Sequence, residues 1–239
     1  PHPTDPELFD ILQNGIFDEA FSTGVLTDVE RELLTVTALA AMQTLPQLKA
    51  HVAAALGAGA SPLQVRETIY QCAPYIGFPK TLNAIDIANG VFEAHGIPLP
   101  LENAGAVDAT DPRAREQACA AIQAPLYGNE VKEVFSALPK PFDEFVPHLL
   151  TSSAFGDFAT RGGLDVAQRE LVSLVAIAAI GASTQLRPHV AGAIRAGSSR
   201  QKVAAALVQV MPYIGGPYAL SGLVLVARYD EKASAEAYR

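Results

Sequence analysis

The sequence predicts an all-α protein made of two related halves, and three observations lead to that prediction. Residues 31–79 recur without a gap as residues 169–217. Apolar residues follow the i, i+3, i+4 spacing of helices. No segment alternates apolar and polar residues over the length of a strand. A repeat this long indicates a duplicated domain, because the units of solenoid repeats run to roughly 20–50 residues.

The first half is predicted to contain a short leading helix and the helices of the repeat. Thr27 or Asp28 caps the first repeat helix. Ser61 and Gln64 stand in capping-box positions at the start of the third. That helix is expected to end at Pro74, because a proline interrupts helical hydrogen bonding.

Two further helices complete the first repeat, at about residues 46–58 and 79–94. The turn at residues 75–79 comes between the third and the last helix. Gly77 within it is expected to take a backbone conformation that other residues avoid.

The segment 97–111 is predicted to be a linker, because it contains prolines and lacks periodicity. We therefore predict a first domain at residues 1–96 and a second at residues 112–239. The helices that lead the second domain should be longer than their first-half equivalents. Its repeat should close with a helix at about residues 217–229.

The composition argues against nucleic-acid and membrane partners. The net charge is −8 and the basic residues are scattered. No apolar run reaches the roughly 18 residues of a membrane span. Hydrophobic residues are 49% of the chain, charged residues only 18%, and mean hydropathy is +0.19. We therefore expect apolar helix faces to be buried between subunits of a homo-oligomer.

Cysteine usage and the first residue bear on cofactors and location. Cys72 and Cys119 lie far apart and form no CxxC, so neither a metal site nor a redox pair is indicated. We expect a cytoplasmic location. The alternative is a removed targeting segment, because the chain begins at Pro1 rather than Met.

Glu32 and His51, repeated as Glu170 and His189, are the candidate catalytic residues. Each glutamate precedes a long run without charged residues. A carboxylate facing such a core has a raised pKa unless it is paired. An imidazole on the next helix is a natural partner, and the two together can donate and accept protons near neutral pH.

Structural roles would explain the same residues. Glu32 in the first turn of a helix favours the helix dipole, and Arg31 or Arg66 could be its ion-pair partner. A single histidine on an apolar face is more often a core residue than a catalyst. These alternatives stay open at the level of the sequence.

Two further residue pairs are retained in both copies and are candidate substrate-binding residues: Gln47 with Gln185, and Tyr75 with Tyr213. Each glutamine precedes the histidine by one helical turn, so it could orient that histidine or bind a carbonyl. The tyrosine hydroxyls could contact a substrate oxygen or anchor the turn.

The pattern REL…LAA…QL…H…AL.AG.S…V…YIG.P resembles the carboxymuconolactone decarboxylase family, within the alkylhydroperoxidase-D-like superfamily. A Glu-to-His spacing of 19 residues and a Tyr-x-Gly-x-Pro turn occur twice. The resemblance implies two tandem alkylhydroperoxidase-D-like helical domains. It also implies assembly as a homotrimer of pseudo-hexameric shape, because a tandem chain would supply both halves of each dimer.

The resemblance also separates two chemistries. The peroxidase branch carries a CxxC between the matching Glu and His. Those positions here are Thr44 and Gln47 in the first repeat, and Ala182 and Gln185 in the second. A thiol peroxidase needs the thiolate that attacks the peroxide, so we reject that activity.

The remaining branch implies a cofactor-independent lyase that acts on a small carboxylated lactone or a related enolisable acid. His51 or His189 would be the acid, and Glu32 or Glu170 would hold its tautomer and charge. The alternative is a non-catalytic helical oligomer that binds a small apolar acid. We expect the two pairs to differ in activity and favour the first half, whose residues 77–88 are closer to the decarboxylase pattern.

Overall fold

The computed structural model describes residues 4–14, 23–108, 110–128 and 130–230, and this part of the chain contains helices and no strand. The first repeat follows α1 (Pro6–Gln13) and holds α2 (Asp28–Met42), α3 (Leu45–Gly57), α4 (Pro62–Ile76) and α5 (Phe78–Ala94). The second repeat holds α9 (Val166–Ala179), α10 (Ser183–Arg195), α11 (Arg200–Ile214) and α12 (Gly216–Ala227). Between the repeats lie α6 (Pro112–Tyr127), α7 (Glu130–Phe135), α8 (Phe142–Leu150) and the π-helix η3 (Thr151–Ala159). The predicted all-α class is confirmed.

Local sequence signals fix where the repeat helices begin. Thr27, not Asp28, is the N-cap of α2. Ser61 caps α4, with its Oγ 3.1 Å from the backbone N of Gln64, while the Gln64 side chain accepts from the backbone N of Ser61 at 2.9 Å. The equivalent helix α9 has a capping box as well. These reciprocal bonds satisfy amide groups that the first helical turn leaves without partners.

The prediction that α4 ends at Pro74 is wrong. Pro74 lies inside the helix, which continues to Ile76 and stops at Gly77, whose φ is 82°. A proline this close to a helix end removes only one hydrogen bond, so two more residues remain helical. The positive φ of Gly77 confirms its expected conformation. The predicted turn over residues 75–79 is too long, because α4 includes residue 76 and α5 begins at residue 78. Pro212 lies inside α11 in the same way.

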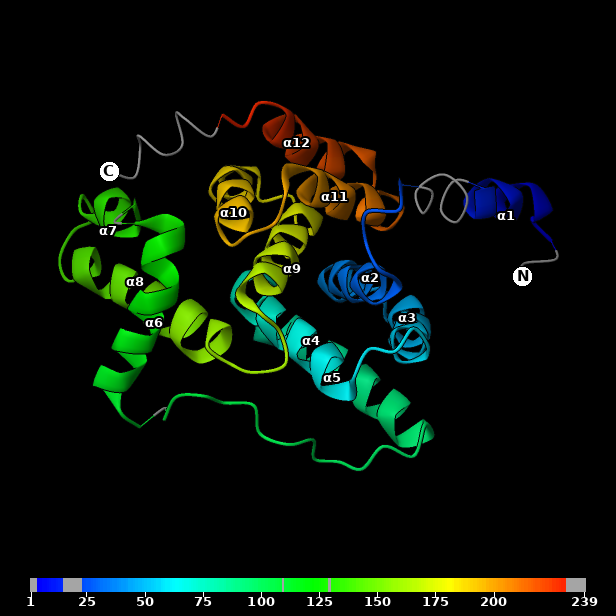
Figure 1. Ribbon diagram of the computed structural model, residues 1–239, viewed down its shortest axis with the longest axis horizontal. Helices are drawn as coiled ribbons and strands as arrows, with labels where there is room; N and C mark the ends of the chain where they lie inside the picture. The colour runs from blue at the N-terminus through cyan, green and yellow to red at the C-terminus, as the bar shows by residue number, and fades with distance from the viewer. Residues whose placement is uncertain (1–3, 15–22, 109, 129, 231–239) are drawn as a thin grey trace.

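The two repeats share one hydrophobic core. Helix α2 contacts α9 and α11, and α4 contacts α9. Figure 1 shows α4 and α9 next to each other at the centre of the molecule. The buried apolar residues of α2, α4, α9 and α11 form a single cluster. The division at residues 97–111 stays a prediction, and the described part of that segment contains no helix.

Buried polar contacts hold the two repeats in register. Nη1 of Arg31 donates to Oε1 of Gln209 at 3.0 Å, and Nε2 of Gln209 donates to Oγ1 of Thr35 at 3.3 Å. The equivalent contacts in the opposite direction, both at 3.1 Å, join Arg169, Gln71 and Ser173. Buried polar groups of this kind are costly unless they are paired. The repeats are therefore arranged about an approximate two-fold axis.

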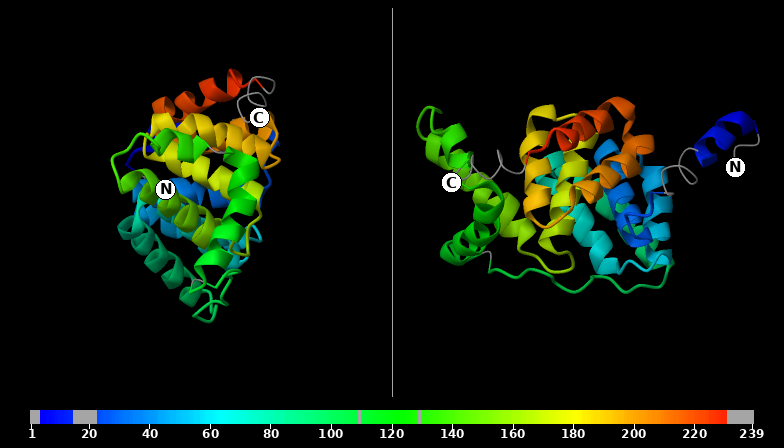
Figure 2. Two further views of the ribbon diagram at one scale, coloured as in Figure 1. Left: turned by 90° about the vertical axis from the view of Figure 1, so that its left-hand side faces the viewer. Right: turned by 45° about the horizontal axis from the view of Figure 1, so that its top comes forward.

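The helices between the repeats pack at one end of the molecule. Figure 1 shows α6, α7 and α8 on one side and α1 on the other, and Figure 2 shows both ends projecting from the body of the two repeats. Helix α6 packs on η3 and α10, with a small apolar cluster of its own. The predicted extra length at the start of the second half is confirmed. None of the helices in the described ranges has the length and hydropathy that crossing a bilayer demands.

Candidate functional site

The first Glu–His pair is a direct contact between neighbouring helices. Glu32 lies on α2 and His51 on α3, and Nδ1 of His51 is 2.8 Å from Oε2 of Glu32. The two side chains are 21% and 16% exposed, histidine first. A carboxylate only accepts hydrogen bonds, so Nδ1 carries the proton. The opposite ring nitrogen, Nε2, is therefore the one left for a substrate.

The second Glu–His pair is separated by a third side chain. Nδ1 of His189 lies 3.5 Å from Oε2 of Glu170, and the side chains are only 11% and 5% exposed. The hydroxyl of Tyr127, at the end of α6, donates to Oε2 of Glu170. The hydroxyl oxygen of Tyr127 is itself 2.9 Å from Nδ1 of His189. Tyr127 therefore occupies the position between the acid and the imidazole.

The second repeat contains a glycine where Tyr127 approaches. A Cβ on Gly192 would overlap the Tyr127 hydroxyl and lie 2.8 Å from Oε2 of Glu170. The equivalent residue of the first repeat is Ala54. The sequence difference between the repeats thus matches the presence of the tyrosine at the second pair.

Each histidine is covered by a tyrosine from the other repeat. The rings of His51 and Tyr213 meet edge to face, with centroids 5.3 Å apart and an interplanar angle of 89°. Tyr75 and His189 form the equivalent contact at 5.4 Å and 87°. Both candidate sites are therefore composite, with the Glu–His pair from one half and the tyrosine from the other.

Both of these tyrosines remain protonated at neutral pH. Burial, assisted by the charge of Glu32, raises the pKa of Tyr213 to about 12. Burial, assisted by the charge of Glu170, raises the pKa of Tyr75 further. Each phenol is therefore a hydrogen-bond donor rather than a phenolate.

The remaining candidate residues lie outside these contacts. Gln47 and Gln185 are exposed, and neither forms a side-chain hydrogen bond with any residue in the described ranges. A role for them in substrate binding stays a prediction. Arg31 donates to Gln209, and Arg66 pairs with Glu67. The observed partner of Glu32 is His51.

Sequence reasoning did not identify Tyr127. It lies in the segment between the repeats, so it has no counterpart whose retention could mark it. A second feature that was missed is the buried Glu67, which binds three arginines. Its counterpart in the second repeat is Ala205. The available signal was therefore a charged residue in one repeat that aligns with an alanine in the other.

The two thiols are poorly suited to redox chemistry. Burial raises the pKa of Cys72 to about 12 and that of Cys119 to about 11. Both are therefore neutral at pH 7, whereas thiol peroxidases act through a thiolate. Within the described ranges, no three His, Cys, Asp or Glu side chains form a group that could hold a metal ion.

Comparison with known proteins connects this geometry to a family. The model of the carboxymuconolactone decarboxylase family matches residues 6–90 and 146–228, which together are more than half of the chain. A curated relative is an uncharacterized 15.0 kDa protein in the nqo9-nqo10 intergenic region of Paracoccus denitrificans, 36% identical over 78 residues. That alignment covers 32% of this chain and 58% of the relative. The two family matches coincide with the two Glu–His pairs.

Proposed function

This chain belongs to the carboxymuconolactone decarboxylase family, and from that premise we propose that it is a lyase whose working site is the Glu32–His51 pair with Tyr213. The substrate class is a small carboxylated lactone or a related enolisable acid. One observation carries the choice of site. The first pair is in direct contact and partly exposed, whereas Tyr127 separates and covers the second.

The proposed reaction is a decarboxylation driven by the lactone itself. The bond from carbon to the carboxylate breaks, carbon dioxide leaves, and the electron pair moves through the double bond to the lactone carbonyl oxygen. The hydroxyl of Tyr213 stays protonated because its pKa is raised to about 12, and it is proposed to donate a hydrogen bond to that oxygen. A proton then returns to carbon.

His51 is proposed to supply that proton. Its Nδ1 is held by Glu32 at 2.8 Å, so the ring keeps one orientation and Nε2 is the nitrogen left for a substrate. In the proposed step the ring starts as the imidazolium, with one proton on Nδ1 toward Glu32 and one on Nε2. Nε2–H gives its proton to the carbanionic carbon, which leaves a neutral ring, and a proton from solvent restores the imidazolium. General acid catalysis of this kind contributes about 10²–10⁴-fold to a rate.

The second site is proposed to be structural. The Tyr127 hydroxyl bonds both Glu170 and His189, so the groups that would act on a substrate already have partners. The side chains are 5% and 11% exposed, which leaves little access for a ligand.

The experiment compares His51→Asn with His189→Asn, using carboxymuconolactone as substrate and carbon dioxide release as the readout. His51→Asn should lose at least about 100-fold in kcat, whereas His189→Asn should stay within a few-fold of the parent chain. Circular dichroism controls for folding. Equal losses in both variants would contradict the assignment to the first site.

Two cavities, of about 600 and 430 Å³, are lined by residues other than the Glu–His pairs.

The competing hypothesis is a non-catalytic helical oligomer that binds a small apolar acid. It would replace the proposal if the parent chain bound the lactone without releasing carbon dioxide. Full activity in the double histidine variant would likewise remove both histidines from the mechanism.

We also propose that the chain self-associates, as a trimer, through the closing helices of the two repeats. Leu82 on α5 is 60% exposed, and its counterpart Leu220 on α12 is 52% exposed. Phe78 and Tyr218 nearby are exposed as well. Sedimentation should give about 76 kDa, three times the 25.2 kDa of one chain. Leu82→Asp with Leu220→Asp should release monomers, and a parent chain that sediments as a monomer would refute the proposal.

A further inference from the structure

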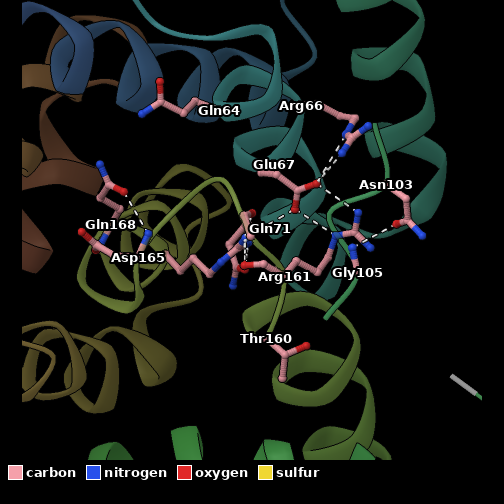
Figure 3. Close-up of polar contacts among 12 residues, drawn as sticks. Gln64, Arg66, Glu67, Gln71, Asn103, Gly105, Thr160, Arg161, Asp165 and Gln168 are labelled. Atoms are coloured by element: carbon pink, nitrogen blue, oxygen red, sulfur yellow. Dashed lines mark hydrogen bonds and ion pairs between the residues drawn. The ribbon is translucent and has the colours of Figure 1, made fainter. Parts of the chain in front are cut away.

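A buried carboxylate with an excess of arginines lies away from both Glu–His pairs. Glu67 on α4 is completely buried. Arg161 contacts it from Nε to Oε2 at 2.9 Å and from Nη2 to Oε1 at 3.0 Å. Nη2 of Arg66 lies 3.1 Å from Oε1, and Nη2 of Arg169 lies 3.4 Å from Oε2. Figure 3 shows the guanidinium groups of Arg66 and Arg161 directed toward the Glu67 carboxylate.

The charges of this cluster do not balance. Three guanidinium groups face one carboxylate, and Asp165 also acts on Arg169 through its charge. The side chains of Arg66 and Arg161 are only 10% and 17% exposed. Charges removed from water are costly unless they are paired. The positive charge left on Arg66 and Arg161 favours an additional anion.

A cavity opens beside these two arginines. It has a volume of about 600 Å³ and is lined by Arg66, Arg161, Tyr70, Asn89 and Asn103, with Ile85 and residues 99–101 as its apolar wall. This volume is typical of small-molecule sites. Figure 3 shows Asn103 next to the guanidinium group of Arg161.

The ring of Tyr70 fixes both arginines at this cavity. The guanidinium carbon of Arg161 lies 5.2 Å from the ring centroid, and that of Arg66 lies 5.5 Å from it. The hydrogen bonds to Glu67 use Nε and Nη2 of each arginine. Within the described residues, Nη1 of Arg66 and Nη1 of Arg161 have no hydrogen-bond acceptor, so each has donor capacity for a ligand.

The repeated fold does not require this arrangement. The positions of Arg66, Glu67 and Tyr70 correspond to Ala204, Ala205 and Val208 in the second repeat, and Arg161 corresponds to Thr23. The second copy therefore forms its helix α11 without any of these charges. The cluster is a feature of one side of the molecule only.

We propose that this cavity binds a small organic anion, a carboxylate or phosphate group attached to an apolar body. The anionic group would accept from Arg66 and Arg161, whose planar guanidinium groups suit such oxygens. The amides of Asn89 and Asn103 would supply further polar contacts. The apolar body would lie against Ile85 and residues 99–101. This site is separate from the Glu32–His51 pair and goes beyond the proposed function.

The test is calorimetric titration of the full chain with benzoate, phenyl phosphate, inorganic phosphate and the neutral isostere benzamide. At least one of the two organic anions should bind, and benzamide should bind at least tenfold more weakly than it. Inorganic phosphate, which lacks the apolar body, should also bind more weakly than phenyl phosphate. Benzamide binding as tightly as both organic anions, or binding by neither of them, would overturn the proposal.

Asn89→Asp places a negative charge in the cavity without removing a contact of Glu67, and should weaken anion binding at least tenfold. Asn83→Asp adds the same charge on the exposed face of the same helix, outside the cavity lining, and is the matched control. Equal weakening by both substitutions would mean a general charge effect and would refute the site. If Asn89→Asp fails to fold by circular dichroism, Asn103→Asp is the second variant. Oδ1 of Asn103 accepts a hydrogen bond from the backbone N of Gly105 at 2.9 Å in the parent chain, and an aspartate keeps an oxygen in that position.

Discussion

Replacing Glu67 by glutamine is the sharpest test of how the two halves are held together. Glu67 on α4 binds Arg161 from the inserted segment and Arg169 from the second repeat. Glutamine has nearly the same shape, so it creates no cavity. It removes the negative charge and turns an NH₂ donor toward the arginines. Three guanidinium groups would then surround a neutral side chain.

The expected loss of stability is large. Removing one partner of a buried ion pair costs about 3–5 kcal/mol, because the remaining charge stays buried without compensation. In a chain of this size 1 kcal/mol corresponds to about 2–4 °C in Tm. Glu67→Gln should therefore lower Tm by about 6–20 °C at pH 7.

The pH dependence of this loss has a defined sign. Burial raises the pKa of Glu67, but hydrogen bonding and the charges of Arg161 and Arg169 outweigh burial and bring the pKa below its ordinary value. A carboxyl with a lowered folded-state pKa contributes stability above its unfolded pKa, near 4.3, and loses it as pH falls through the folded value. The difference between the parent chain and Glu67→Gln should thus be full at pH 7 and shrink in acid.

Urea denaturation followed by circular dichroism at several pH values measures both effects. Glu93→Gln is the matched control, because Glu93 is exposed on α5, and it should change the free energy of unfolding by no more than about 0.5 kcal/mol. A loss below about 1 kcal/mol for Glu67→Gln, or a loss unchanged between pH 7 and strong acid, would show that the reasoning about the buried pair is wrong.

Three further predictions follow from the site geometry. Tyr127→Phe removes a buried hydroxyl bonded to a carboxylate and should cost about 1.5–3 kcal/mol of stability. A urea midpoint equal to that of the parent chain would contradict this. The raised pKa of Tyr213 makes the parent chain lose stability as pH rises from 10 to about 12, and Tyr213→Phe should lose less over that range in urea titrations. Replacing Cys72 and Cys119 together by serine should leave carbon dioxide release intact, and a loss of turnover in the folded variant would restore thiol chemistry.

The sequence by itself determined the duplication and the all-α class, and it identified Glu32 and His51 as candidates without deciding that they are partners. Helix starts depend on residues three positions apart, so Ser61 and Gln64 could be identified as a capping box from their spacing. Glu32 and His51 lie on consecutive helices joined by a short turn, which limits how far apart they can be. The predicted end of α4 at Pro74 was wrong, because the cost of a proline depends on how much helix remains after it.

Only the tertiary structure decided what surrounds each pair. Tyr213 reaches His51 because α11 packs on α2 about the approximate two-fold axis, and helical periodicity within one repeat contains no information about that packing. Tyr127 reaches Glu170 because α6 folds back on α10. Both contacts depend on shape and burial between segments distant in the chain. The same long-range packing places Arg161 beside Glu67, so the difference between the two sites emerges only when the halves and the inserted helices are assembled.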